Sequence, residues 1–202
     1  MTLQEAKLRL EDTIQRTDLA VNYTTYINQA LRDVSLFHSF DEMKAEVTFV
    51  FSIGDQIKPL PSLFKETQGG RFSAISTDGS RYAVFNIQEI EKLYPTLRPS
   101  RHLLLSRIGQ SQYIYLPSPA TSSLTFTLRY YAYPTVLVAD TDVSNMVTNY
   151  TNMIISKAAA IALQSVNDDQ FQTHLTVFAG EVKQKTDEDI KISFPQPRPD
   201  KT

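Results

Sequence analysis

Residues 113–134 read YIYLPSPATSSLTFTLRYYAYP, and this stretch has the clearest β-strand pattern in the chain. Tyr113 and Tyr115 alternate along its first arm, and residues 117–119, Pro-Ser-Pro, interrupt strand pairing. The second arm places an apolar or aromatic side chain at every second position, namely at Leu124, Phe126, Leu128 and Tyr130. The pattern predicts a β-hairpin, around which the rest of the chain can be ordered.

Both ends of the chain have helical spacing. Thr2 and Glu5 have the spacing of a capping box, which predicts that the first helix starts there, and residues 17–18 offer a break and a second N-cap. Asn167 is predicted to cap the last helix. The remaining helices follow apolar stripes at steps of three and four, which include Tyr26, Ile27, Ala30, Leu31 and Val34 near the start and Met146, Met153, Ile154, Ala158 and Ile161 near the end.

The middle of the chain favours β-structure. Residues 45–53 alternate as a strand, and residues 102–108 and 112–116 are predicted to pair as strands joined at Gly109. Residues 62–65 suit a single helical turn. These patterns predict an α+β fold in which N- and C-terminal helices build a helical bundle with a β-rich insertion between them.

The predicted boundaries follow the changes of period. We expect residues 1–40 to supply the N-terminal helices of the bundle and residues 41–139 the β-rich insertion. Residues 140–190 then supply the C-terminal helices. Residues 191–202 form an extended, proline-rich tail, because three prolines in the last ten residues are incompatible with a helix or a central strand.

Composition excludes several classes of protein. The 20 basic and 22 acidic residues give a net charge of −2, which argues against holding nucleic acid by bulk charge. The chain has no cysteine, so disulfides and thiolate chemistry are excluded. A charged N-terminus and the lack of an apolar run of about 18 residues predict neither a signal peptide nor a membrane span.

No catalytic, metal or cofactor site is predicted. Three histidines, His38, His102 and His174, lie far apart without a nearby nucleophile or ligand pattern. Residues 140–144, DTDVS, have oxygen ligands at alternate positions but lack the glycine and glutamate of a calcium loop, which indicates a linker with a helix cap.

Two groups of residues suggest contacts with other molecules. A basic group is formed by Lys92, Arg98, Arg101 and Arg107. It faces a phosphate backbone or an acidic partner or, as the simpler interpretation, forms a solvated rim. Tyr130, Tyr131 and Tyr133 put rings on both faces of one strand. Core packing on one face and a protein contact on the other explain them better than base stacking does, since tyrosine is enriched at interfaces.

Five stretches, taken in order, resemble a known family. They are INQALRDVS (27–35), PLPSLFKE (59–66), residues 109–134 with the Tyr-Tyr-x-x-Pro ending, YTNMIISKAAAIAL (150–163) and NDDQFQTHLTVFAGEV (167–182). Together they resemble the head-to-tail adaptor (connector) proteins of tailed bacteriophages over nearly the whole chain. The resemblance implies a non-enzymatic virion protein at the head–tail neck, assembled in the host cytoplasm.

The resemblance also implies partners. They are further copies in a ring of twelve, the portal protein, tail or neck proteins, and double-stranded DNA that passes through without specific binding. On this hypothesis Tyr150 and the alanines Ala158, Ala159 and Ala160 make bundle or subunit contacts. The portal contact is assigned to the tail residues Phe194, Pro195, Pro197, Arg198 and Pro199. A tail-side neck or fibre-attachment protein and a small hydrolase remain as alternatives.

Overall fold

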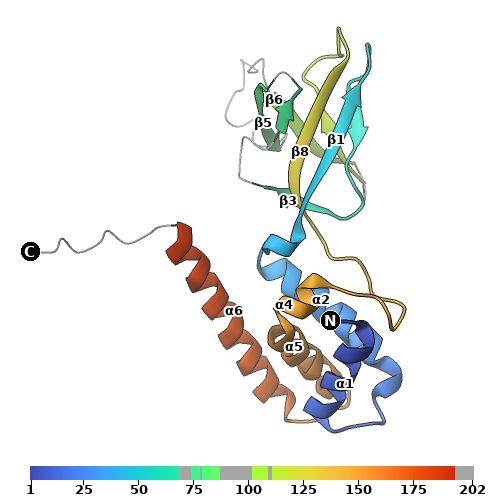
Figure 1. Ribbon diagram of the computed structural model, residues 1–202, viewed down its shortest axis with the longest axis vertical. Helices are drawn as coiled ribbons and strands as arrows, with labels where there is room; N and C mark the ends of the chain where they lie inside the picture. Colours follow the sequence, from blue (N-terminus) through green and yellow to red (C-terminus); the bar gives the residue numbers. More distant parts are fainter. Residues whose placement is uncertain (69–73, 78, 87–101, 109–110, 194–202) are drawn as a thin grey trace, which may run out of the picture. The chain divides into compact units, whose positions relative to one another are not determined.

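A computed structural model describes residues 1–68, 74–77, 79–86, 102–108 and 111–193. The chain divides into two compact units (Figure 1). One comprises Met1–Glu42 with Pro134–Thr202 and contains the described α-helices, and the other comprises Met43–Tyr133 and contains the strands. No helix among the described residues is long and apolar enough to span a membrane.

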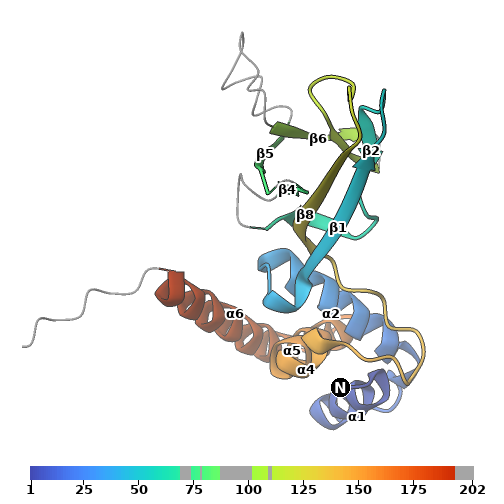
Figure 2. The same ribbon diagram turned by 45° about the horizontal axis from the view of Figure 1, so that its top comes forward.

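The β unit is one eight-stranded sheet in the order β1-β8-β4-β5-β6-β7-β2, with β3 also paired to β8. β1 and β2, the two ends of that order, are in contact, so the sheet curls into a nearly closed barrel (Figure 2). Its strands are β1 (Lys44–Phe51), β2 (Ile57–Pro59), β3 (Phe64–Thr67), β4 (Ala74–Ser76), β5 (Arg81–Asn86), β6 (His102–Ile108), β7 (Ser111–Tyr115) and β8 (Leu124–Ala132).

The predicted hairpin over residues 113–134 is wrong, although both of its arms are strands. β7 pairs with β6 and β2, whereas β8 pairs with β1, β3 and β4. The loop between the two arms binds the β1–β2 turn instead. The Gly54 amide donates to the Ala120 carbonyl at 2.8 Å, and the Ala120 amide donates to the Asp55 carbonyl at 2.9 Å. These hydrogen bonds separate the arms and direct them to different partners.

β8 organises the sheet because neighbours pair along both of its edges. Its inward side chains, Phe126, Leu128 and Tyr130, are buried. The Phe126 ring meets the rings of Phe51 and Tyr82 edge-on, at centroid distances of 5.9 and 4.7 Å. Burial of this aromatic cluster gives the β unit a hydrophobic core of its own.

The predicted α+β class is confirmed, but the predicted architecture, a helical bundle with a β-rich insertion, is wrong. The described residues form a mixed α+β protein in which a nearly closed eight-stranded sheet is a compact unit, with helices at both ends of the chain. The sheet is more than an insertion because it closes around its own buried cluster. The strand pair over residues 102–116 is confirmed as β6 and β7, whereas the predicted helical turn at residues 62–65 gives way to β3.

The helical unit begins as predicted. Thr2 and Glu5 form the capping box of α1, with the Glu5 amide donating to the Thr2 hydroxyl at 3.2 Å. The predicted N-cap at residues 17–18 is wrong, because a 3-10 turn intervenes and α2 starts after Asn22. The elements are α1 (Leu3–Ile14), η1 (Ala20–Asn22), α2 (Tyr23–Phe37), η2 (Asp41–Met43), α4 (Asn145–Asn149), α5 (Thr151–Gln164) and α6 (Phe171–Ser193).

α5 is the central helix of this unit and contacts α1, α2, α4 and α6. Asn167 does not cap α6 as predicted. It takes a left-handed conformation (φ 54°) after α5, and the Asp168 carboxylate accepts from the Gln170 amide at 3.0 Å just before α6. The segment that returns to the helices is fixed by Asn28, whose side chain makes two hydrogen bonds with the Leu137 backbone.

Candidate interaction groove

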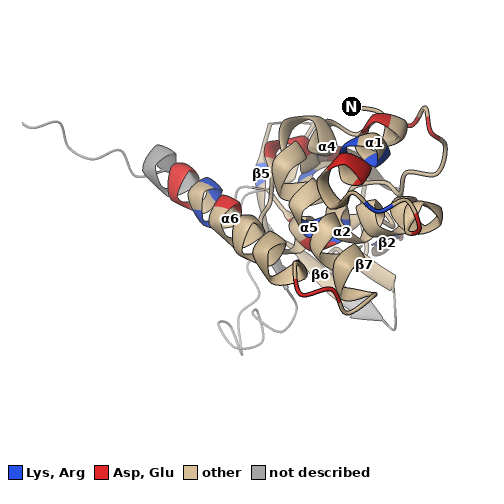
Figure 3. Ribbon diagram, turned by 90° about the horizontal axis from the view of Figure 1, so that it is seen from below, with Lys and Arg blue, Asp and Glu red and all other residues tan. Residues whose placement is uncertain are grey.

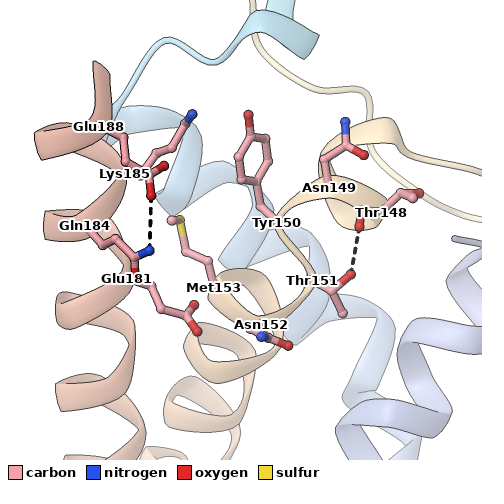
Figure 4. A pocket seen from close by; sticks show the side chains of 10 residues that line it. All are labelled: Thr148, Asn149, Tyr150, Thr151, Asn152, Met153, Glu181, Gln184, Lys185 and Glu188. Atoms are coloured by element: carbon pink, nitrogen blue, oxygen red, sulfur yellow. Dashed lines mark hydrogen bonds between the residues drawn. The ribbon is translucent and has the colours of Figure 1, made fainter. Parts of the chain in front are cut away.

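Two adjoining hollows follow α5 and α6 on the helical unit, and we call them together the α5/α6 groove. They share Thr151, Asn152 and Glu181. The first, of about 410 Å³, extends along α4 and the second half of α6 (Figure 4). The second, of about 450 Å³, extends to α1. Both volumes lie in the range of about 300–1,000 Å³ that is common for binding pockets.

The α4 end of the groove is held by hydrogen bonds to a carboxylate. Tyr150 Oη and Asn149 Nδ2 donate to the two oxygens of Glu42, at 2.9 and 2.6 Å. Burial alone would favour the neutral Glu42 carboxyl, but these hydrogen bonds outweigh it and hold its pKa below the ordinary value. The centroid of the Tyr150 ring lies 4.4 Å from that of Phe40. The Asn149 and Tyr150 side chains at this end of the groove therefore already have partners within the unit.

Glu181 lines both hollows, and Figure 4 shows it among the residues of the first. Its Oε2 is the only buried side-chain oxygen or nitrogen among the described residues that has no hydrogen-bond partner. Burial raises the pKa of this carboxyl. A buried carboxylate oxygen without a hydrogen bond costs free energy, so a cation or hydrogen-bond donor brought to this oxygen would be stabilised.

The α1 end of the groove is more apolar. Ile155 is buried at its base, and Val177 on α6 keeps 45% of its surface exposed. Arg9 and Asp12 of α1 form the opposite rim. This end therefore combines an apolar surface with the unpaired Glu181 oxygen and the charged rim of α1.

Charges of both signs occur along α6. Figure 3 shows basic and acidic positions alternating in the second half of the helix, which carries Lys183, Lys185, Asp187 and Glu188. Such alternation is typical of a solvated helix and gives no surface of one sign for a nucleic-acid backbone.

A sequence profile of one family, the SU10 adaptor proteins, matches residues 1–196. The chain belongs to the SU10 adaptor protein family. This is a family of phage head-to-tail adaptors, so the predicted family is confirmed. No curated protein matches the chain in sequence.

Membership gives the adaptor a general role. It is a structural phage protein of a class that is generally non-enzymatic and that assembles with portal and tail proteins at the virion neck. The groove is accordingly interpreted as a surface for protein contact.

The predicted contact residues of the adaptor lie in different places. Tyr150 lines the groove, whereas Ala158, Ala159 and Ala160 are buried inside the helical unit on α5. The predicted portal-contact residues, Phe194, Pro195, Pro197, Arg198 and Pro199, lie outside the described residues.

The tyrosines of β8 and the segment after it are only partly accessible. Tyr130 is buried, and its ring stacks on Phe64 at a centroid distance of 5.5 Å. Tyr131 and Tyr133 are half-buried. Two of the three rings therefore keep some surface for a partner.

Sequence reasoning missed Glu181. Nothing in its neighbourhood singles it out, because an acidic residue on a charged helix is ordinary. Of the described histidine side chains, His38 meets Phe40 edge-on at 4.9 Å, and His174 is half-buried on α6. His102 belongs to β6, and its side chain is outside the described part.

The residues at 140–144 act as a linker and cap, as predicted. Asp142 accepts from the Val138 and Ala139 amides, and Ser144 caps α4. Asp140 binds Lys7 at 2.7 Å. In the described part of the chain, no group of three or more His, Asp or Glu side chains is placed to hold a metal ion.

The predicted basic group cannot be placed in the structure. Its residues Lys92, Arg98 and Arg101 lie outside the described residues, as does the Arg107 side chain.

Proposed function

We propose that the chain forms a ring of twelve copies beneath the portal, which joins the phage head to the tail and lets genomic DNA pass. The observation that carries this proposal is the match to the SU10 adaptor family over residues 1–196. A closed ring needs a heterologous contact, in which two different surfaces of each subunit meet.

The net charge of the chain supports a ring through which DNA passes without being bound. A protein that neutralises many phosphates binds DNA tightly, because each contact releases a counterion. With a net charge of −2, this adaptor has no bulk excess of basic residues for such binding. DNA then passes along the ring without being retained.

The portal contact is assigned to the proline-rich tail. The residue types at Phe194, Pro195, Pro197, Arg198 and Pro199 supply an aromatic ring, a guanidinium group and three prolines, a combination that suits docking of an extended segment. Deletion of residues 192–202 is expected to weaken docking on purified portal rings. Unchanged affinity would contradict the tail assignment.

The decisive experiment is electron cryomicroscopy of the cognate portal incubated with the purified adaptor. We expect a ring of twelve adaptors, with a mass twelve times the 22.9 kDa of one chain, directly on the portal. DNA binding should be weak and should fall further with salt. An adaptor found on the tail but absent from the portal would favour the tail-side neck protein instead.

A further inference from the structure

The two sides of α5 present different surfaces. Ile155 and Lys157 are two residues apart, which places them about 200° apart around the helix axis. Ile155 faces the α5/α6 groove, with Val177 and Glu181 beside it. Lys157 faces the other side, where its Nζ lies 3.4 Å from Asp33 of α2 and 5.3 Å from the Phe178 ring centroid. The helical unit therefore has two unlike faces, as a heterologous ring contact requires.

The face on the α2 side carries an exposed apolar pair. Leu36 is 56% exposed and Phe37 is 64% exposed at the end of α2. Phe37 is held by an edge-on contact with Phe178 at a centroid distance of 5.7 Å, so its ring is fixed while most of its surface stays open. We call Arg32, Leu36 and Phe37 the α2 patch.

Arg32 gives the α2 patch its charge. It lies one turn before Leu36 on the exposed side of α2, and its guanidinium makes no ion pair with a described residue. In the groove, Glu181 has a buried carboxylate oxygen that makes no hydrogen bond with any described residue. The two faces thus have complementary features: the α2 patch joins two exposed apolar side chains to the Arg32 cation, and the groove joins the exposed Val177 to the unpaired Glu181 oxygen, beside the charged rim of Arg9 and Asp12.

We propose that the α2 patch of one subunit docks into the α5/α6 groove of the next copy. Leu36 and Phe37 then cover the exposed Val177, and Arg32 supplies the missing partner of Glu181. This inference rests on the proposed ring and names the two surfaces that close it. The contact buries apolar side chains that the isolated unit leaves in water and pairs a carboxylate that burial otherwise destabilises.

Cysteine cross-linking tests the contact directly, since the natural chain has no cysteine. The double variant Leu36→Cys with Val177→Cys, assembled on cognate portal rings and oxidised, should give a ladder of covalent multimers. Each single variant should stop at dimers. The control pairs Val177→Cys with Val21→Cys, a residue on η1 that is more exposed than Leu36, at 86%. A ladder no stronger than this control would overturn the inference.

A charge exchange tests the pairing of Arg32 with Glu181. Arg32→Glu and Glu181→Arg, each alone, place like charges together at every subunit contact and should weaken ring assembly at least about tenfold. The combined variant should recover to within about threefold of the natural chain. Lys183→Glu and Asp187→Arg, at exposed positions of α6, serve as controls with matched charge changes. Equal assembly by both single variants and the natural chain would refute the pairing.

The two proposals fail differently. If the natural chain forms its ring on the portal while neither the cross-link nor the charge exchange behaves as expected, only the docking of the α2 patch is wrong. If the natural chain binds portals without forming a ring, the proposed function fails and no ladder appears. Circular dichroism of every variant, matching the natural spectrum, shows that a loss of assembly is not a loss of folding.

Discussion

Replacing Asn28 by Ala should loosen the helical unit at the segment that returns to it from the strands. The Asn28 amide nitrogen donates to the Leu137 carbonyl at 2.8 Å, and the Leu137 amide donates to Asn28 Oδ1 at 2.9 Å. Leu137 itself is buried. These two side-chain hydrogen bonds fix a segment that has no regular secondary structure around residue 137.

The expected cost follows from these bonds. Each hydrogen bond contributes about 0.5–1.5 kcal/mol, so losing two costs roughly 1–3 kcal/mol. Alanine recovers up to about 0.7 kcal/mol through its higher helix propensity. The free energy of unfolding of the helical unit should therefore fall by roughly 0.3–3 kcal/mol. Gln29→Ala, at the next and exposed position of α2, is the matched control and should change it by less than about 0.5 kcal/mol.

Hydrogen exchange followed by mass spectrometry is the suitable assay, because it reports on the two units separately. Peptides that contain Leu137 and α2 should exchange faster in Asn28→Ala than in Gln29→Ala. Urea denaturation should show a lower midpoint for the same variant. If the two variants exchange alike around residue 137, the Asn28 hydrogen bonds do not hold this segment and the reasoning is refuted.

Two further predictions concern the sheet and the effect of pH. Phe126→Ala should cost about 3–5 kcal/mol, because it removes a fully buried ring that contacts Phe51 and Tyr82, whereas Arg129→Ala on the same strand loses only an exposed ion pair with Glu46 and should cost less than about 1 kcal/mol. Thermal melts that rank the two variants equally would contradict this. Hydrogen bonds from the Val138 and Ala139 amides hold the pKa of Asp142 below its ordinary value of 3.8. The stability it contributes is present above that value and is lost as the pH falls through the lower native pKa. Unfolding of Asp142→Asn should therefore depend less on acid than unfolding of the natural chain, and identical acid titrations would refute the role of this carboxylate.

The sequence predicted correctly those elements that depend on residues close together along the chain. The capping box at Thr2 and Glu5 involves residues three positions apart, so the start of α1 is predictable. β1 and the β6–β7 pair follow from alternation and a short connection. The family could also be recognised from the sequence alone, because the motifs and their order along the chain are properties of the sequence.

Long-range pairing was decided only by the tertiary structure. Residues 113–134 have the pattern of a hairpin, yet backbone hydrogen bonds from the distant β1–β2 turn divide the arms between different neighbours. Alternation specifies which side chains share a face of a strand, but it does not specify the partner strand. The predicted bundle with an insertion failed for the same reason, because closure of the sheet depends on pairings between distant residues.

The candidate groove was likewise decided only by the tertiary structure. Sequence alone determined an α+β protein with apolar helix faces, a near-neutral charge and the motifs of a phage adaptor. Only the tertiary packing buries one carboxylate oxygen of Glu181 without a partner among the described residues and leaves Leu36 and Phe37 of α2 exposed. Burial is a property of the whole surrounding structure, and residue type and spacing along the chain therefore do not reveal it.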